Sequence, residues 1–353
     1  MIAMSNLFGV ARSRLFNSVG NGALSVAAVT MTLWIAWAVV EWGILDARIF
    51  AASDRECHDA GACWAVIRAQ WRLIVFGTYP AAETWRPAAV LCVLIGLMSV
   101  SVVRRVWHPR LVLAWIVGLL GCVLLLRGGF LGLPRVETDR WSGLPLTLLL
   151  GLAALLSSFP LAVLLALGRR SRLPVVRTVC AGFVELTRAL PLISLLFIAS
   201  LVLPLFLPAG LTIDKLVRAF VALTVFSAAY LAEVVRGGLQ SIPKGQIEAA
   251  EALGLSYAAR TRLVVLPQAL MAVVPALANT FIVMMKNTSL VLVVGVFDLL
   301  AAAKSVLSNP DWSSSSSELY AFVTAIYFAI SFYISFLSRK VERIRATWSR
   351  SGA

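Results

Sequence analysis

The sequence predicts an all-α, polytopic membrane protein with about eight transmembrane helices, and three observations support this fold class. Hydrophobic residues make up 60% of the 353-residue chain, and the mean hydropathy is +0.89. Charged residues make up only 14% of the chain, whereas a soluble domain carries roughly 25%. Apolar runs also recur along the sequence at close to the ~20 residues that a helix needs to cross a bilayer.

The net charge of +14 could indicate a nucleic-acid-binding protein, but the distribution of the charges argues against that class. The cations lie in short clusters between the apolar runs. Membrane proteins carry such clusters on their cytoplasmic side. The composition therefore favours a bilayer, and no nucleic acid is expected as a partner.

Eight segments are expected to span the membrane: 23–42, 88–103, 111–126, 145–167, 176–206, 218–236, 268–295 and 319–338. The fifth contains Pro191 and Pro204 and should be kinked or broken, because proline interrupts helical hydrogen bonding. The apolar stretch 268–303 would reach ~54 Å as one helix. That is too far for a single crossing, so a break is expected near Lys286.

The placement of the cations sets the expected orientation. Arg339 and Lys340, the basic tail at 341–353 and most other clusters fall on one side if both termini face the cytoplasm. In this N-in, C-in topology the loop 237–267 is cytoplasmic, and the loop 43–87 lies in the outer compartment.

The chain divides into two expected parts before its tail. Residues 1–140 form an N-terminal extension of three transmembrane helices, and residues 141–340 hold the other five. The outer loop at 43–87 is amphipathic and should contain a short helix on the membrane surface. It holds Cys57 and Cys63, so a disulfide is plausible there, and two free thiols are the alternative. No cysteine spacing indicates a metal site.

The most informative segment is the loop 241–267, SIPKGQIEAAEALGLSYAARTRLVVLP. A proline near its start suits a first helical turn, and most of the residues that follow favour helix. Gly254 fits the left-handed position just past a helix end, and Ser256 can cap a second helix. Leu266 and Pro267 should end that second helix at the membrane.

This loop is long for a membrane protein that works alone, because about two to eight residues would connect two spans. Its two short helices favour a docking element. Ala249 and Ala250 offer a small-residue patch for close approach, and Glu248 and Glu251 offer carboxylates to a basic partner. A pair of interfacial helices without a partner is the alternative, which composition alone leaves equally open.

The same stretch resembles the cytoplasmic signature of ABC importer permeases: Glu-Ala-Ala, three residues, Gly, nine residues, a β-branched apolar residue, one residue, Leu-Pro. The matching residues are Glu248, Ala249, Ala250, Gly254, Val264, Leu266 and Pro267. The family usually has isoleucine where Val264 stands. The flanking stretches AYLAEVVRGGLQSIPKGQ (229–246) and KNTSLV (286–291) resemble the polar amino-acid branch, the histidine/glutamine-type permeases.

The resemblance implies a five-helix core of the type I, MetI-like importer fold over about 141–340. It also implies that the loop is the coupling helix, which fits a groove in a separate ATPase. ATP-driven closure of two ATPases would then switch two permease subunits from inward-open to outward-open. Glu248 would pair with a basic residue of the ATPase, and Gly254 would permit the sharp turn.

This chain is not expected to be an enzyme. It contains no Gly-Lys dipeptide and therefore no phosphate-cradling GxxxxGK[ST] loop. ATP and Mg²⁺ would bind to the partner ATPase, and neither a cofactor nor a metal is expected in this chain.

Polar side chains at membrane depth are candidates for the translocation path, because a charge there is costly and tends to face protein or water. Glu185 and Arg188 are three residues apart on one helix face and could neutralise each other. Arg188 begins Arg-Ala-Leu-Pro-Leu, whereas the family has Arg-Gly-Thr-Pro-Leu, so a structural pair at a kink is the competing interpretation.

The seventh span offers a second group of candidates. Lys286 could attract the carboxylate of an amino acid, and its neighbours Asn287 and Thr288 and the more distant Asn279 are further candidates. Stabilisation of a helix end, or contact with the outer surface, is the alternative for Lys286.

The front of the chain, at 57–80 and 85–87, resembles the M-type subunit of general L-amino-acid permeases. This resemblance implies broad specificity, a heterodimer with a related permease, a periplasmic binding protein and a bacterial inner membrane. The rival function is an ion-coupled secondary amino-acid transporter, which predicts chains of acidic groups inside the spans; a scaffold without a transport path is a further alternative. The sequence does not rank the amino acids or say which subunit holds the substrate.

Overall fold

The computed structural model describes residues 15–57, 61–101, 103, 108–208 and 210–351, with side chains up to 342. These residues are helical, with isolated bridges but no strand among them. They form two compact units: residues 1–70 with 307–319, and residues 71–306 with 320–353.

The first unit begins with a long apolar helix. The π-helix η1 (Glu41–Leu45) extends α2 (Val19–Val40), and together they are long enough to cross a membrane. Ser18 caps α2 by accepting a hydrogen bond from the backbone N–H of Asn21 at 3.2 Å. The short 3₁₀ helix η2 (Asp54–Cys57) follows, and then α3 (Ala65–Phe76), whose last turns belong to the second unit.

A disulfide and several long-range hydrogen bonds hold the rest of the first unit together. The sulfur atoms of Cys57 and Cys63 are bonded to each other. The buried carboxylate of Glu318 accepts a hydrogen bond from the backbone N–H of Cys63 at 2.9 Å. Asp54 accepts one from the backbone N–H of Ser314 at 2.8 Å. These contacts join two segments that lie far apart in the sequence.

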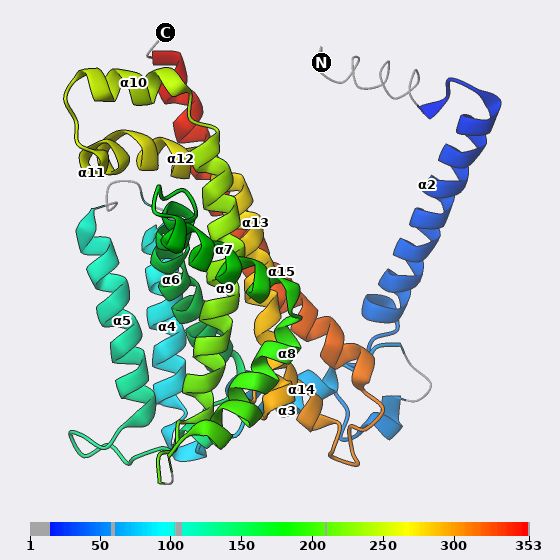
Figure 1. Ribbon diagram of the computed structural model, residues 1–353. Coiled ribbons are helices and arrows are strands. Elements are labelled where there is room, and N and C mark those ends of the chain that lie inside the picture. Colours follow the sequence, from blue (N-terminus) through cyan, green and yellow to red (C-terminus); the bar gives the residue numbers. More distant parts are fainter. Residues whose placement is uncertain (1–14, 58–60, 102, 104–107, 209, 352–353) are drawn as a thin grey trace. The chain divides into compact units, whose positions relative to one another are not determined.

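The second unit contains the remaining helices (Figure 1), in the order η3 (Ala81–Glu83), α4 (Trp85–Ser101), α5 (Pro109–Arg127), η5 (Thr138–Arg140), α6 (Gly143–Arg169), α7 (Pro174–Ala189), α8 (Leu192–Phe197), η6 (Ile198–Val202), η7 (Leu203–Phe206), α9 (Lys215–Gln240), α10 (Lys244–Ala252), α11 (Tyr257–Arg260), η8 (Thr261–Val265), α12 (Leu266–Ala272), α13 (Val274–Asn287), η9 (Thr288–Val294), α14 (Leu299–Val306) and α15 (Ser316–Ser351). The first turn of α15, to Leu319, lies in the first unit.

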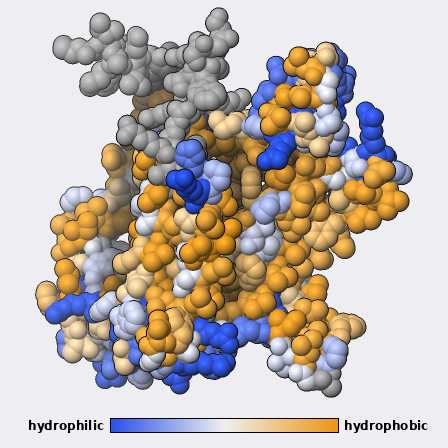
Figure 2. Space-filling model, turned by 90° about the vertical axis from the view of Figure 1, so that its left-hand side faces the viewer, coloured by the Kyte–Doolittle hydropathy of each residue, from blue (hydrophilic) through white to orange (hydrophobic). Residues whose placement is uncertain are grey.

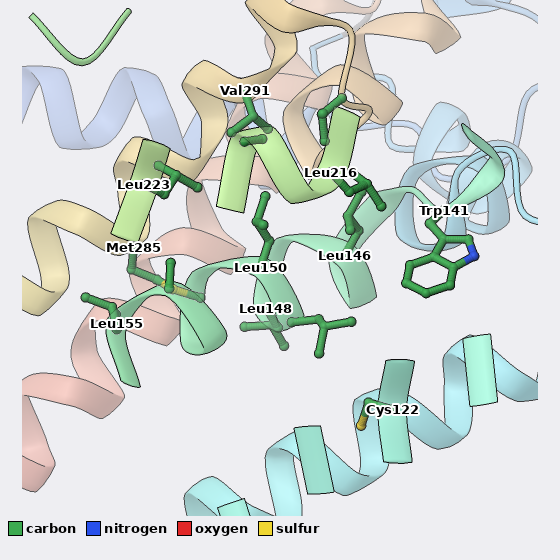
Figure 3. Packing of buried hydrophobic residues seen from close by; sticks show 14 of the residues in the cluster. Cys122, Trp141, Leu146, Leu148, Leu150, Leu155, Leu216, Leu223, Met285 and Val291 are labelled. Carbon is green, nitrogen blue, oxygen red and sulfur yellow. The ribbon is translucent and has the colours of Figure 1, made fainter. Parts of the chain in front are cut away.

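The core of the second unit centres on α6 and α9. Leucines of α6 interdigitate with Leu216 and Leu223 of α9 and with Met285 and Val291 of the α13–η9 segment (Figure 3). Cys122 of α5 belongs to the same cluster. The helices α4 and α5 therefore pack with the five-helix region in one unit, although the sequence places them in a separate extension. The division at residue 140 stays a prediction about domain origin.

The expected all-α, multi-span fold class is confirmed. Seven described helices are long and apolar enough to cross a membrane, and the bent pair α7–α8 brings the number to eight. The break expected in the fifth span lies at Pro191, where α7 and the helix after it meet at 105°. The break expected near Lys286 lies further along: α13 passes into η9 after Asn287, the two together form one candidate span from Val274 to Val294, and the chain turns at Gly295 with φ +75°.

Apolar side chains cover much of the surface, as a protein solvated by lipid requires. Figure 2 shows a mostly hydrophobic face, with hydrophilic side chains gathered toward its ends. Helix α5 contributes a ladder of exposed apolar residues to the surface: Val112, Leu113, Ile116, Val117 and Leu120.

Among the described residues of the second unit, the side chains of one arginine and one aspartate are buried outside the expected sites. The guanidinium of Arg86 is fully buried and donates to the carbonyl oxygens of Leu125, Leu126 and Pro134 at 2.7–2.9 Å. Those of Leu125 and Leu126 belong to the last turn of α5, which has no helical donors for them. Arg86 thereby ties the start of α4 to the end of α5.

The second buried group is Asp298, which is 1% exposed and lies between the spans that contain α13 and α15. It accepts hydrogen bonds from the backbone N–H of Ala301 at 2.9 Å and from the hydroxyl of Tyr327 at 3.2 Å. The adjacent N–H of Leu299 donates to Thr147 of α6 at 2.8 Å. Burial raises the pKa of the Asp298 carboxyl to about 6, against the opposing effect of its hydrogen-bond donors.

Candidate functional site

The candidate site is the segment that follows α9, from Ser241 to Ala272, which we call the coupling segment. Helix α9 is continuous to Gln240, and three residues later Pro243 caps α10 with extended backbone (φ −58°, ψ 138°). The sequence suggested a proline inside the first helical turn of α10, whereas Pro243 directly precedes that turn. The segment projects from one end of the second unit (Figure 1).

Helix α10 presents one face to the protein and another to the surroundings. Ala250 is 4% exposed, because it turns toward the second limb of the segment, the part from Ser256 to Ala272. Glu248 and Ala249 are exposed, and Leu253 at the end of the helix is 80% exposed. The small-residue patch expected from Ala249 and Ala250 is thus divided: Ala250 packs inside and Ala249 lies on the surface.

The turn after α10 requires glycine. Gly254 adopts φ +74°, in the left-handed region that side chains with a Cβ atom avoid. This conformation brings the backbone N–H of Leu255 to the carbonyl oxygen of Ala250 at 3.1 Å, which closes the end of the helix. The helix end predicted at Gly254 is confirmed.

The second limb begins as predicted and ends differently. The hydroxyl of Ser256 caps α11 by accepting from the backbone N–H of Ala259 at 3.3 Å. The prediction that Leu266 and Pro267 end this helix is wrong, because they form the first turn of α12, which continues to Ala272. The π-helix η8 precedes them, and Pro267 stands in a first turn, where its missing N–H costs little.

The base of the coupling segment is fixed to α9. Val265 and Ala269 share a buried cluster with Val235 and Leu239 of α9. Gly238 permits this approach, because a Cβ atom there would lie 2.6 Å from the carbonyl oxygen of Ala269. The tip of the coupling segment, α10 with the turn at Gly254, is exposed, and its base around Val265 and Ala269 is packed. A force applied to the tip would therefore reach α9.

The two carboxylates expected to face a basic partner, those of Glu248 and Glu251, differ in their contacts. Glu251 forms an ion pair with Arg260 across the turn, so it braces the segment itself. Glu248 has no ion pair among the described residues, and no hydrogen bond to its side chain is present there either. Among the described residues, Glu248 is thus an exposed carboxylate with no ion pair, whereas Glu251 is paired.

The charged residues at membrane depth do not pair as the sequence suggested. Glu185 pairs with Arg169 of α6 at 3.1 Å. Arg188 lies 3.6 Å from Glu233 of α9 and 5.5 Å from the ring centre of Tyr230. The expected neutralisation of Glu185 by Arg188 is wrong, because each side chain turns toward a neighbouring helix.

The candidates on the seventh span fall into two sets. Lys286 and Asn279 are exposed and lie seven residues apart, close to two helical turns, on one face of α13. Thr288 is 1% exposed and donates to the carbonyl oxygen of Met285 at 2.7 Å, so it is packed inside the protein. Asn287 is half-buried and its amide approaches the sulfur of Met284 at 3.8 Å.

The sequence interpretation missed Arg86 and Asp298, and it gave Glu233 only a local role. Each is an ionisable residue in or beside an apolar run, and that placement was the available signal. The described residues contain no group of His, Cys, Asp or Glu with metal-ligating geometry.

Comparison with known proteins agrees with this geometry. Residues 158–344 match the family model "Binding-protein-dependent transport system inner membrane component". The chain is 41% identical to the inner membrane amino-acid ABC transporter permease protein YhdY of Escherichia coli K12, over 94% of this chain and 91% of YhdY. It is 34% identical to the glutamate/glutamine/aspartate/asparagine transport system permease protein BztC of Rhodobacter capsulatus, over 94% and 93% of the two chains.

A solved structure, the crystal structure of an amino acid ABC transporter with histidines, is 33% identical and superimposes with a TM-score of 0.51. It covers 57% of this chain and 91% of its own. These matches confirm the importer-permease resemblance drawn from the Glu-Ala-Ala, Gly, Leu-Pro spacing. The chain belongs to the family of inner-membrane components of binding-protein-dependent transport systems, the permeases of ABC importers.

Proposed function

We propose that this chain is the membrane-spanning subunit of an ATP-driven importer that moves polar or general L-amino acids, and that the coupling segment transmits the work of a separate ATPase. The names of the relatives YhdY and BztC support amino acids as the substrate class. The rival of ion-coupled secondary transport has no specific support in the described residues.

The observation that carries this proposal is the form of the coupling segment. It has an exposed tip, where Glu248 has no ion pair among the described residues, a glycine turn at Gly254, and a base fixed on α9 through Val265 and Ala269. A partner with a basic groove could grip the tip, and the base would pass its displacement to the spans. Leu266 and Pro267 act here as the start of the packed base.

The remaining parts of the importer follow from the same proposal. Two ATPase subunits would bind ATP and Mg²⁺, and a periplasmic binding protein would deliver the amino acid. The match along the whole length of YhdY and BztC supports an M-type subunit, paired with a second, homologous permease. The proposed orientation in the bacterial inner membrane is N-in and C-in, with the coupling segment in the cytoplasm and the Cys57–Cys63 disulfide in the oxidising periplasm.

The translocation path is proposed along the exposed face of α13. Lys286 would attract the substrate carboxylate and Asn279 would offer a hydrogen bond two turns away. Arg188 and Glu185 belong to an ion-pair cluster at α7 and are not assigned to the path. Asn287 and Thr288 directly follow Lys286 and are proposed to hold the end of α13 in shape. A Lys286→Gln variant should raise the KM for uptake.

The decisive experiment measures amino-acid uptake by the complete importer in proteoliposomes. Glu248→Arg should abolish ATP-dependent uptake, because it opposes the basic groove, while the binding protein still binds its ligand. The control is Glu137→Arg, which reverses an exposed carboxylate that pairs with Arg135 and lies beside Thr138, whose hydroxyl contacts Asp214 at the start of α9. Normal uptake by Glu248→Arg would contradict the proposal.

A further inference from the structure

Five side chains form a cluster where α6, α7 and α9 meet, and Glu233 stands at its centre: Arg169, Glu185, Arg188, Glu233 and Arg236. One carboxylate oxygen of Glu233 lies 2.7 Å from Arg169 and 3.6 Å from Arg188. The other oxygen accepts from Arg236, through Nε at 3.1 Å and through Nη2. Glu233 therefore contacts three guanidinium groups from three helices.

The excess of positive charge in this cluster makes the negative charge of Glu233 necessary to hold it together. It holds three cations and only two carboxylates. The side chain of Glu185 is 68% exposed and pairs with one described cation, Arg169, whereas that of Glu233 is 26% exposed and is shared by all three cations. Without the Glu233 charge the three guanidinium groups would repel one another in a partly desolvated site, where electrostatic forces are stronger than in water.

The position of Glu233 links the coupling segment to the bent span. It lies about two turns before the end of α9, on the same continuous helix that holds the base of the coupling segment. Arg188 lies at the end of α7, two residues before Leu190 leaves the helix and Pro191 starts the 105° bend into α8. Figure 1 shows α7 beside the part of α9 that leads toward α10.

The three contacts of Glu233 differ in strength. Arg169 and Arg236 form close ion pairs with Glu233, but Arg188 stands at 3.6 Å, is 38% exposed and also lies over the ring of Tyr230. Arg169 and Arg236 thus hold the carboxylate in place. The contact of Arg188 is the loosest of the three, and it is the one that joins α7 to α9.

We propose that Glu233 is the positioning residue through which a displacement of the coupling segment reaches the bend between α7 and α8. The ATPase moves the tip, α9 moves with the base, and Glu233 draws Arg188 and the start of the bend along. This inference rests on the proposed importer function. It assigns to Glu233 a role in coupling and no contact with the substrate.

The test compares Glu233→Gln with Glu185→Gln in the complete importer in proteoliposomes, with ATP hydrolysis and uptake measured together. Both variants remove one carboxylate charge from the same cluster, but only the first removes the shared acceptor. We expect Glu233→Gln to lower the amino acid taken up per ATP about tenfold, within the roughly 5–150-fold range of allosteric couplings. ATP hydrolysis should persist, because the tip is intact, and Glu185→Gln should change the ratio less than about twofold.

Three outcomes would overturn the inference: an unchanged ratio in Glu233→Gln, an equal loss in both variants, or a parallel loss of hydrolysis and uptake. If Glu233→Gln does not assemble, Arg188→Gln decides, since it leaves Glu233 paired with Arg169 and Arg236. A wild-type ratio in Arg188→Gln would then refute the transmission. Failure of the importer function itself would be separate, because wild-type protein would then show no ATP-dependent uptake.

Discussion

The two adjacent glycines at the end of α9 offer a direct test of how closely the coupling segment must approach that helix. At Gly238, a Cβ atom would lie 2.6 Å from the carbonyl oxygen of Ala269 and 2.8 Å from a methyl carbon of Val273. At Gly237, a Cβ atom would meet nothing within 4 Å. Both glycines are helical, so replacement by alanine brings the same gain in helix propensity, up to about 1 kcal/mol.

Gly238→Ala should therefore be less stable than Gly237→Ala by the cost of the clash alone. Ordinary van der Waals contact begins at 3.4 Å, so the backbone of α12 must retreat by most of an ångström. Overpacking of this kind costs about 1–3 kcal/mol, and the backbone oxygen cannot turn aside as a side chain could. Gly237→Ala should be neutral or slightly stabilising.

The measurement is the midpoint of thermal unfolding of the detergent-solubilised importer for both variants, with uptake measured in parallel. Gly238→Ala should unfold at a lower temperature and lose uptake, because α12 and the tip it supports are displaced. If the two variants unfolded together, the close approach of α9 and α12 would not exist, and the argument for a firmly held base would fail with it.

Three further perturbations probe the rest of the chain. The pKa of the Asp298 carboxyl is raised to about 6, so the free energy of unfolding should fall as the pH rises from about 4 to 7, by about 3 kcal/mol in total. Unfolding midpoints measured over this pH range should fall in wild type and stay level in Asp298→Asn. Arg86→Gln should lower the free energy of unfolding by about 3–5 kcal/mol, because it breaks a buried charge network. An unchanged unfolding midpoint would show that the carbonyls of α5 need no donor. Replacing Cys57 and Cys63 by serine should lower the free energy of unfolding by about 2 kcal/mol, because the disulfide no longer restricts the unfolded chain. Cys92→Ser, at a free and exposed thiol, should leave the unfolding midpoint unchanged.

Local sequence rules predicted the coupling segment well where a single residue controls the backbone. Gly254 is needed for a left-handed turn and Ser256 has a hydroxyl that caps a helix, and neither requirement depends on distant parts of the chain. The same rules misplaced the end of the second limb at Pro267. A proline can end a helix or start one, and the packing of Val265 and Ala269 on α9 selects the second.

Side-chain partners at membrane depth were the weakest part of the sequence interpretation. Spacing places Glu185 and Arg188 on neighbouring turns of one helix, but that spacing says nothing of the helices beside them. The partners of both residues, Arg169 and Glu233, lie on α6 and α9. Similarly, nothing local distinguishes the buried Thr288 from the exposed Lys286 two residues earlier.

The sequence alone determined that the chain is helical, crosses the membrane about eight times and carries the spacing of an importer permease. These properties depend on the length of apolar runs and on local backbone preferences, which neighbouring residues set. Only the tertiary structure decided which charges meet at Glu233, that Gly238 admits α12, and that α4 and α5 join the five-helix core. Those outcomes depend on distances between helices far apart in the chain, and hydrophobic periodicity contains no information about such distances.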